Sequence, residues 1–207
     1  MKRALVASVL GIVASLATVA SSRGQGQMFF DNYGSTPYYP VMYNSDASQL
    51  PAGYGALAGH GVGGTFKVEL WYALGNNNVA GLVDSGISVF VNPTLTAPPG
   101  GVGAPETGYF QGPIITVPGY VSGPVTFRFE AWETAGPTDG ATYATSNSRG
   151  QLTWTEPSIP SAGNPAGFFT ALPGPTLIIP IPEPCTGTLA GIGTIALFVI
   201  RYQSRKC

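Results

Sequence analysis

Two segments of the chain alternate between apolar and polar residues with a period of two, the spacing of a half-buried β-strand. In residues 65–72 one face carries Phe66, Val68 and Leu70, and the other carries Lys67 and Glu69. In residues 124–132 one face carries Val125, Phe127, Phe129 and Ala131. The opposite face of that segment carries Thr126, Arg128, Glu130 and Trp132. The pattern therefore predicts two strands whose apolar faces share a core.

Weaker β-type runs occupy residues 86–91, 109–117 and 152–155, and turn residues separate them. Pro113 interrupts the second of these runs, which predicts an edge strand or a bulge there. Long stretches rich in glycine, proline and polar residues, 34–63 and 96–105, predict irregular loops. Short strands between turn clusters favour an all-β fold, an antiparallel sandwich or barrel-like sheet with long Gly/Pro-rich loops.

Apart from its two ends, the chain has the length of one domain, and residues 25–172 form the predicted β-rich extracytoplasmic domain. Between residues 25 and 180 there are nine acidic residues and three basic ones, a net charge of −6. Nucleic-acid binding depends on lysine and arginine that neutralise phosphates, so the charge argues against it. This part of the chain has no cysteine, hence neither a disulfide nor a thiolate metal site.

The N-terminal segment 1–24 has the layout of a secretory signal peptide. Lys2 and Arg3 precede an uncharged, apolar run over residues 4–20, which predicts a signal helix. Cleavage after Ala20, after Ser22 or as late as Gly26 fits the small residues that follow. The alternative is an uncleaved N-terminal anchor helix.

The C-terminal segment carries three consecutive features after residues 173–181, a predicted proline-rich stalk whose Thr-Leu-Ile-Ile run is also a possible final strand. A Pro-Glu-Pro motif at 182–184 is followed by an apolar stretch, 186–200, and by the basic residues Arg201, Arg205 and Lys206. Fifteen helical residues extend only about 22 Å, short of a hydrocarbon core of about 30 Å, so a buried core helix is the alternative. The basic end favours a transmembrane helix with a cytoplasmic stop.

This three-part order resembles the PEP-CTERM sorting domain of bacterial exported proteins. Pro182, Glu183, Pro184, Cys185 and Thr186 correspond to the Pro-Glu-Pro-Ser-Thr core of that family, with cysteine where serine is usual. The resemblance covers residues 182–206 and implies processing by an exosortase, after a signal peptidase has removed the N-terminal signal. It further implies export across the inner membrane, a transient membrane anchor and release to the cell surface or extracellular matrix.

Candidate catalytic chemistry is sparse. His60, the one histidine of the chain, lies in a glycine-rich segment with no Gly-x-Ser-x-Gly elbow elsewhere, so an exposed loop residue is expected. Four turn aspartates, Asp31, Asp46, Asp84 and Asp139, could serve calcium, but they lack the spacing of a calcium loop. We therefore predict solvated turn acids and no cofactor or metal site.

Glu69 and Glu130 could form a glycosidase pair, which needs two carboxyl groups across a sugar cleft. Cross-strand ion pairs with Lys67 and Arg128 are the simpler interpretation. Trp132, on the polar face of its strand, is the best candidate for stacking on a glycan, although packing of loops by large aromatic side chains is an alternative.

Taken together, these features predict a non-enzymatic exported cell-surface or extracellular-matrix protein. The alternative is a carbohydrate-binding module of the polysaccharide matrix, and a more remote one is a secreted hydrolase that uses His60.

Overall fold

The computed structural model describes residues 25–51, 53–95, 107–135, 140–161 and 163–180. The predicted signal peptide (1–24) and sorting tail (182–206) lie outside these residues, as do both terminal helices expected from the sequence. Within the described ranges, no helix has the length and apolar character needed to cross a membrane. The described chain is all-β, with three short 3-10 turns, Ala47–Gln49, Gly55–Leu57 and Val79–Gly81.

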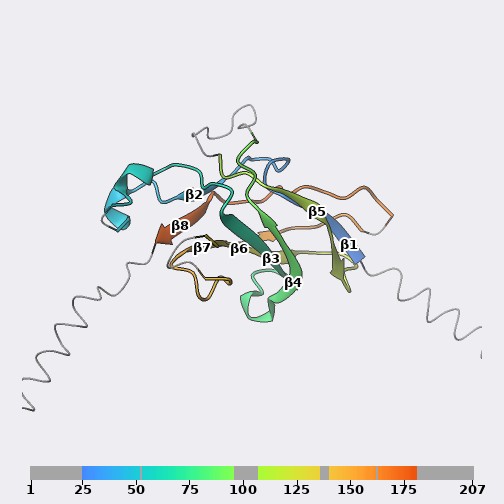
Figure 1. Ribbon diagram of the computed structural model, residues 1–207. Coiled ribbons are helices and arrows are strands. Elements are labelled where there is room, and N and C mark those ends of the chain that lie inside the picture. Colours follow the sequence, from blue (N-terminus) through green and yellow to red (C-terminus); the bar gives the residue numbers. More distant parts are fainter. Residues whose placement is uncertain (1–24, 52, 96–106, 136–139, 162, 181–207) are drawn as a thin grey trace, which may run out of the picture.

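In the described residues eight strands form two sheets that enclose one core (Figure 1). The smaller sheet pairs β1 (Gln25–Asp31) with β5 (Gln111–Pro118) in antiparallel fashion. The larger sheet has the order β2-β8-β7-β6-β3-β4. Its strands are β2 (Val41–Tyr43), β3 (Phe66–Leu74), β4 (Val83–Phe90), β6 (Val125–Glu133), β7 (Ser148–Glu156) and β8 (Thr176–Pro180).

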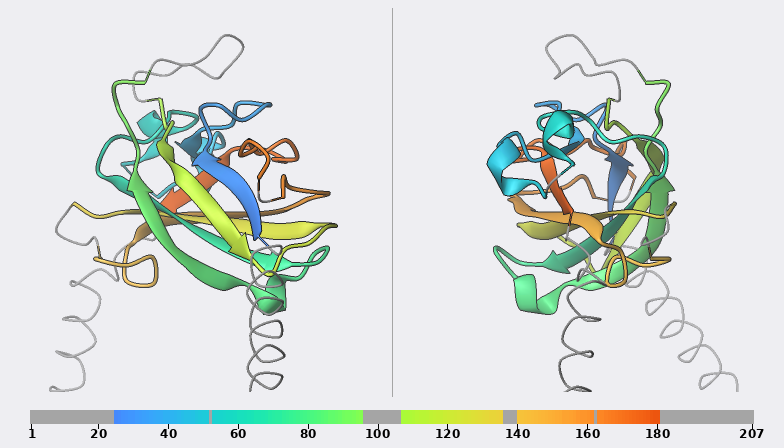
Figure 2. Two further views of the ribbon diagram at one scale, coloured as in Figure 1. Left: turned by 90° about the vertical axis from the view of Figure 1, so that its right-hand side faces the viewer. Right: turned by 60° about the vertical axis from the view of Figure 1, so that its left-hand side comes forward.

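The arrangement is a sandwich that begins to close toward a barrel. β4, β5 and β1 lie side by side across the strands of the larger sheet (Figure 2). The Asn92 amide, just after β4, donates to the Tyr109 carbonyl just before β5 at 2.9 Å. On the other side of β1, the Gln27 amide donates to the Pro160 carbonyl at 2.9 Å. Loops thus continue the small sheet on both sides, which confirms the sandwich-like all-β class expected from the sequence.

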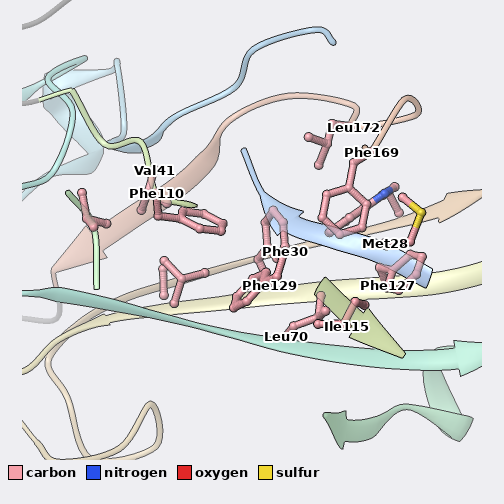
Figure 3. Close-up of a cluster of buried hydrophobic side chains, with 14 of the residues drawn as sticks. Met28, Phe30, Val41, Leu70, Phe110, Ile115, Phe127, Phe129, Phe169 and Leu172 are labelled. Carbon is pink, nitrogen blue, oxygen red and sulfur yellow. The ribbon is translucent and has the colours of Figure 1, made fainter. Parts of the chain in front are cut away.

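The core lies between the two sheets and is rich in phenylalanine (Figure 3). The alternation in β3 and β6 works as expected, because Val68, Leu70, Phe127 and Ala131 are fully buried. Phe129 occupies the centre and packs against the rings of four aromatic residues, Phe30, Phe110, Trp154 and Phe169. The ring-centroid distances there range from 4.6 Å, to Trp154, up to 5.7 Å, to Phe30. Aromatic burial at this density supplies much of the driving force for folding.

Two further local predictions meet different outcomes. The register between β1 and β5 shifts where Asp31 pairs with Gln111 after Phe29 pairs with Ile114, so the predicted irregularity at Pro113 is present. The segment expected to combine a possible final strand with a stalk contains β8, which pairs with β7 and with β2, so residues 176–180 belong to the sheet and not to a stalk. Burial of Ile178 in the core is the reason, since this segment alternates like the other strands. Gly150 permits that pairing, because a Cβ there would overlap the Leu177 carbonyl.

The irregular stretch 34–63 contains little regular structure apart from β2 and two of the 3-10 turns. Asn32 fixes its start through buried hydrogen bonds. The Nδ2 group donates to the carbonyls of Tyr39 (3.0 Å) and Gly108 (3.2 Å), and Oδ1 accepts from the Phe110 amide at 2.7 Å. This side chain therefore connects the long loop to residues 108–110, just before β5.

Candidate functional site: the outer face of the larger sheet

We call the side of β3, β6 and β7 that points away from the core the outer face. Pairing in register places its side chains in rows across the three strands. One row contains Lys67, Trp132 and Arg149. The next contains Glu69, Glu130 and Gln151, and the third contains Trp71, Arg128 and Thr153. The face therefore combines two indole rings with charged, amide and hydroxyl groups.

Trp132, the residue predicted to stack on a glycan, is not presented to solvent. Its side chain is only 3% exposed, and the Lys67 ammonium lies over its ring at 5.7 Å. Arg149, from the neighbouring strand β7, holds the loop of the β6–β7 connection against the sheet through hydrogen bonds to the carbonyls of Tyr143 (2.9 Å) and Ala144 (2.6 Å). The burial of Trp132 favours the packing alternative over glycan stacking at this ring, because strand alternation does not report what covers the polar face.

Trp71 is the more accessible indole of this face. It is half-buried, and the Arg128 guanidinium lies over its ring at 5.0 Å. Sequence reasoning missed it as a candidate, although its position two residues after Glu69 places it on the same face. The alternation that places Lys67 and Glu69 on the polar face places Trp71 there as well when it is continued by two residues.

Glu69 and Glu130 lie directly opposite each other on neighbouring strands. The ion pair found here joins Glu130 to Arg128, its neighbour on the same strand, at 2.9 Å. This pair along β6 stands in place of the expected cross-strand pairs with Lys67 and Arg128. Glu69 therefore faces a second carboxylate across the ladder, an arrangement that is unfavourable when both are charged.

Burial raises the pKa of both carboxyl groups. For Glu69 the desolvation effect is largest, and the negative charges of Asp84 and Glu130 raise its pKa further. For Glu130 desolvation again dominates, and the Arg128 charge opposes it. The indole N–H of Trp71 lies near enough to both carboxylates to lower their pKa slightly, yet no acceptor meets hydrogen-bond geometry with it.

Three N–H groups on this face are buried without an acceptor in hydrogen-bond geometry. They are Nε1 of Trp71, Nε of Arg128 and Nε1 of Trp132. Buried donors are nearly always paired in folded proteins, so each exception needs an explanation. The outer face therefore combines carboxylates that are costly to ionise with donors that have no partner.

The other predicted candidates occupy structural positions. The His60 carbonyl accepts from the Tyr43 amide at 2.9 Å, in the loop that borders β2. Asp46 accepts from the Ser48 amide at 2.9 Å, and Asp84 from the Gly86 amide at 2.7 Å. Asp31 accepts from two amides of its own turn, and Asp139 lies outside the described residues. Within the described ranges no group of three acidic, histidine or cysteine side chains could hold a metal ion.

Glu156 is a buried acid that sequence reasoning did not single out. It is 1% exposed and accepts from Nε1 of Trp154 (3.0 Å) and from the amides of Thr170 and Ala171 (both 3.0 Å). Its second oxygen accepts from the Thr170 hydroxyl at 2.8 Å. All these donors belong to the protein, so Glu156 fastens the segment after β7 to the sandwich and is not a ligand site.

Comparison with family models, curated proteins and solved structures found no match to this chain. Sequence and geometry alone therefore carry the functional argument.

Proposed function

We propose that this chain is a non-enzymatic exported protein of the cell surface or extracellular matrix. A signal peptide over residues 1–24 directs its export, and a PEP-CTERM-like tail over residues 182–206 anchors it until an exosortase cleaves near Pro182-Glu183-Pro184. The observation that carries the proposal is the order of the tail: motif, apolar stretch 186–200, then the basic residues Arg201, Arg205 and Lys206.

The boundaries of the fold support this division of the chain. β1 begins at Gln25, directly after the predicted signal peptide, and β8 ends at Pro180, two residues before the Pro-Glu-Pro motif. Removal of both signals would therefore leave the described strands intact. The phenylalanine core provides stability without the disulfides that many exported domains use.

A non-enzymatic role is supported by how the candidate groups are used. The acids Asp31, Asp46 and Asp84 accept hydrogen bonds from nearby backbone amides, which orders turns. Glu130 is engaged by Arg128, where a general acid would need to face a substrate.

The test is fractionation of the native host, followed by mass spectrometry of the mature termini. We expect an N-terminus between Ser21 and Gln27 and a C-terminus near Pro184 in the matrix fraction. A Glu183→Ala variant should accumulate in the membrane, whereas Thr188→Ala, in the same tail but outside the motif, should be processed normally. Recovery of an intact Cys207 in the matrix-released form would refute the sorting model.

A further inference from the structure

The outer face contains both hydrogen-bond acceptors and hydrogen-bond donors that the protein pairs incompletely. Glu69 and Glu130 place two carboxylates opposite each other, with the charge of Asp84 close enough to act on both. Beside them, the indole N–H of Trp71 is close enough to both carboxylates to lower their pKa but meets neither in hydrogen-bond geometry, and the indole N–H of Trp132 has no acceptor in hydrogen-bond geometry. Trp132 is 97% buried, so its donor has been removed from water without compensation.

From this arrangement we infer that the outer face binds a polyhydroxylated ligand, a segment of an uncharged polysaccharide, centred on Trp71, Glu69 and Glu130. The inference rests on the proposed function and deepens it, because it assigns a matrix component as the partner of the exported domain.

Charge and hydrogen-bonding capacity select this ligand class over the alternatives. A cation would compensate the carboxylates but would leave the N–H groups without acceptors. An anion would accept from the N–H groups and would meet Lys67, Arg128 and Arg149 in the flanking rows, but in the central row it would be repelled by Glu69 and Glu130. A hydroxyl group donates and accepts at once, so neighbouring hydroxyls of a sugar ring can donate to the carboxylates and accept from the indoles.

The aromatic groups point to the same ligand class. The guanidinium of Arg128 lies over Trp71 at 5.0 Å, and the ammonium of Lys67 lies over Trp132 at 5.7 Å. The Arg128 guanidinium, which is also paired with Glu130, covers the face of Trp71 on which the C–H groups of a sugar would stack, whereas the buried Trp132 ring is not available for stacking. Binding therefore requires Arg128 to move off the Trp71 ring, and sugar stacking then replaces the cation–π contact.

Strand β7 adds uncharged polar side chains beside the proposed glycan site. Gln151 is exposed on β7 in the row of Glu69 and Glu130, and Thr153 is half-exposed in the row of Trp71. Amide and hydroxyl side chains of this kind orient a ligand by hydrogen bonds without adding charge. A sugar chain that runs along these two rows would contact β3, β6 and β7.

The experiment measures binding of the full chain, purified in detergent, to soluble polysaccharides by affinity electrophoresis and tryptophan fluorescence. The uncharged probes are dextran, xylan, mannan and a β-glucan, and alginate serves as the anionic probe. We expect at least one uncharged probe to retard the protein, and alginate to retard it more weakly. Failure of every uncharged probe with protein that melts cooperatively would overturn the inference, as would preferential binding of alginate.

Two variants at one position locate the site. Trp71→Ala removes both the ring and the N–H group and should weaken binding about tenfold, whereas Trp71→Phe keeps a ring to stack on and should weaken it less. Phe168→Ala removes an aromatic residue that is 41% exposed and stacks on Phe29 of the opposite sheet. This control should leave binding unchanged within twofold, and an equal loss in Phe168→Ala and Trp71→Phe would place binding elsewhere. Because binding is measured on purified protein, its failure is separate from a failure of sorting, which fractionation detects.

Discussion

Glu156 offers the sharpest test of how this sandwich is held together. Its carboxylate accepts four hydrogen bonds, from the Trp154 indole, the Thr170 amide and hydroxyl, and the Ala171 amide. Since the side chain is 1% exposed, water cannot replace it without a cavity opening. Glu156→Ala should therefore leave several buried donors without partners, each at a cost of about 1–3 kcal/mol.

We expect Glu156→Ala to lower the free energy of unfolding by about 4 kcal/mol, a large part of the roughly 5–15 kcal/mol that such domains possess. Glu156→Gln keeps the shape and one acceptor oxygen but turns an amide donor toward other donors, so a loss of about 2 kcal/mol is expected. Urea denaturation followed by tryptophan fluorescence measures both values. Trp154 is a direct reporter, because its own indole donates to the substituted side chain.

The control is Glu133→Gln, the same chemical change at a carboxylate that accepts from the Thr65 hydroxyl at 3.3 Å near the surface. It should alter stability by less than about 0.5 kcal/mol. The reasoning is refuted if Glu156→Gln and Glu156→Ala both behave like this control. Limited proteolysis adds a spatial check, because the segment between residues 157 and 172 should become the first site of cleavage in Glu156→Ala.

Three further changes probe other parts of the structure. Phe129→Ala should cost about 3–5 kcal/mol in urea denaturation, because it leaves a cavity among four aromatic rings; a loss below 1 kcal/mol would contradict the placement of the core. Asn32→Ala should cost about 2–3 kcal/mol through three lost hydrogen bonds, whereas Asn164→Ala, which loses an exposed hydrogen bond to the Ser161 hydroxyl, should cost little. Glu69→Gln should stabilise the protein at pH 7 by about 0.5 kcal/mol but have little effect near pH 3.5. Because the pKa of Glu69 is raised in the folded state, the protein loses stability as pH rises above the pKa of the unfolded state, and the neutral amide of the Glu69→Gln variant avoids that loss. Equal effects of the substitution at the two pH values would contradict this explanation.

The sequence predicts most clearly those strand faces whose burial depends only on the alternation of the strand itself. In β3 and β6 the apolar side meets the core directly, so Phe66 and Phe127 are buried as alternation requires. Such local periodicity needs no knowledge of the rest of the chain. Pro113 is similar, because a missing amide restricts the pairing of its own strand wherever that strand lies.

The polar side of the same strands shows where local pattern stops being informative. Trp132 and Thr126 are as buried as the residues of the core face, since distant segments cover them. The Thr126 hydroxyl accepts from the Asn78 amide at 2.9 Å, across 48 positions of sequence, and Arg149 holds the Tyr143 loop beside Trp132. β8 is predicted only as a possible strand within a stalk for a related reason, because its prolines resemble a stalk until the partners β2 and β7 are known.

The contrast between two groups of buried polar side chains strengthens the case for a ligand on the outer face. Glu156 and Asn32 are satisfied entirely by protein donors and acceptors, which shows that this fold can pair its buried polar groups fully. Glu69 instead faces Glu130, and the nearby Trp71 indole N–H meets neither carboxylate in hydrogen-bond geometry, at a point where the pairing of β3 with β4 shifts in register. If these groups had only a structural role, residues that pair them within the protein would be favoured, since each missing hydrogen-bond partner lowers stability. The expected stabilisation in Glu69→Gln and the expected weakening of glycan binding in Trp71→Phe therefore follow from one arrangement. The outer face is less stable than it would be with fully paired polar groups, and the hydroxyl groups of a bound glycan would supply the missing hydrogen-bond partners.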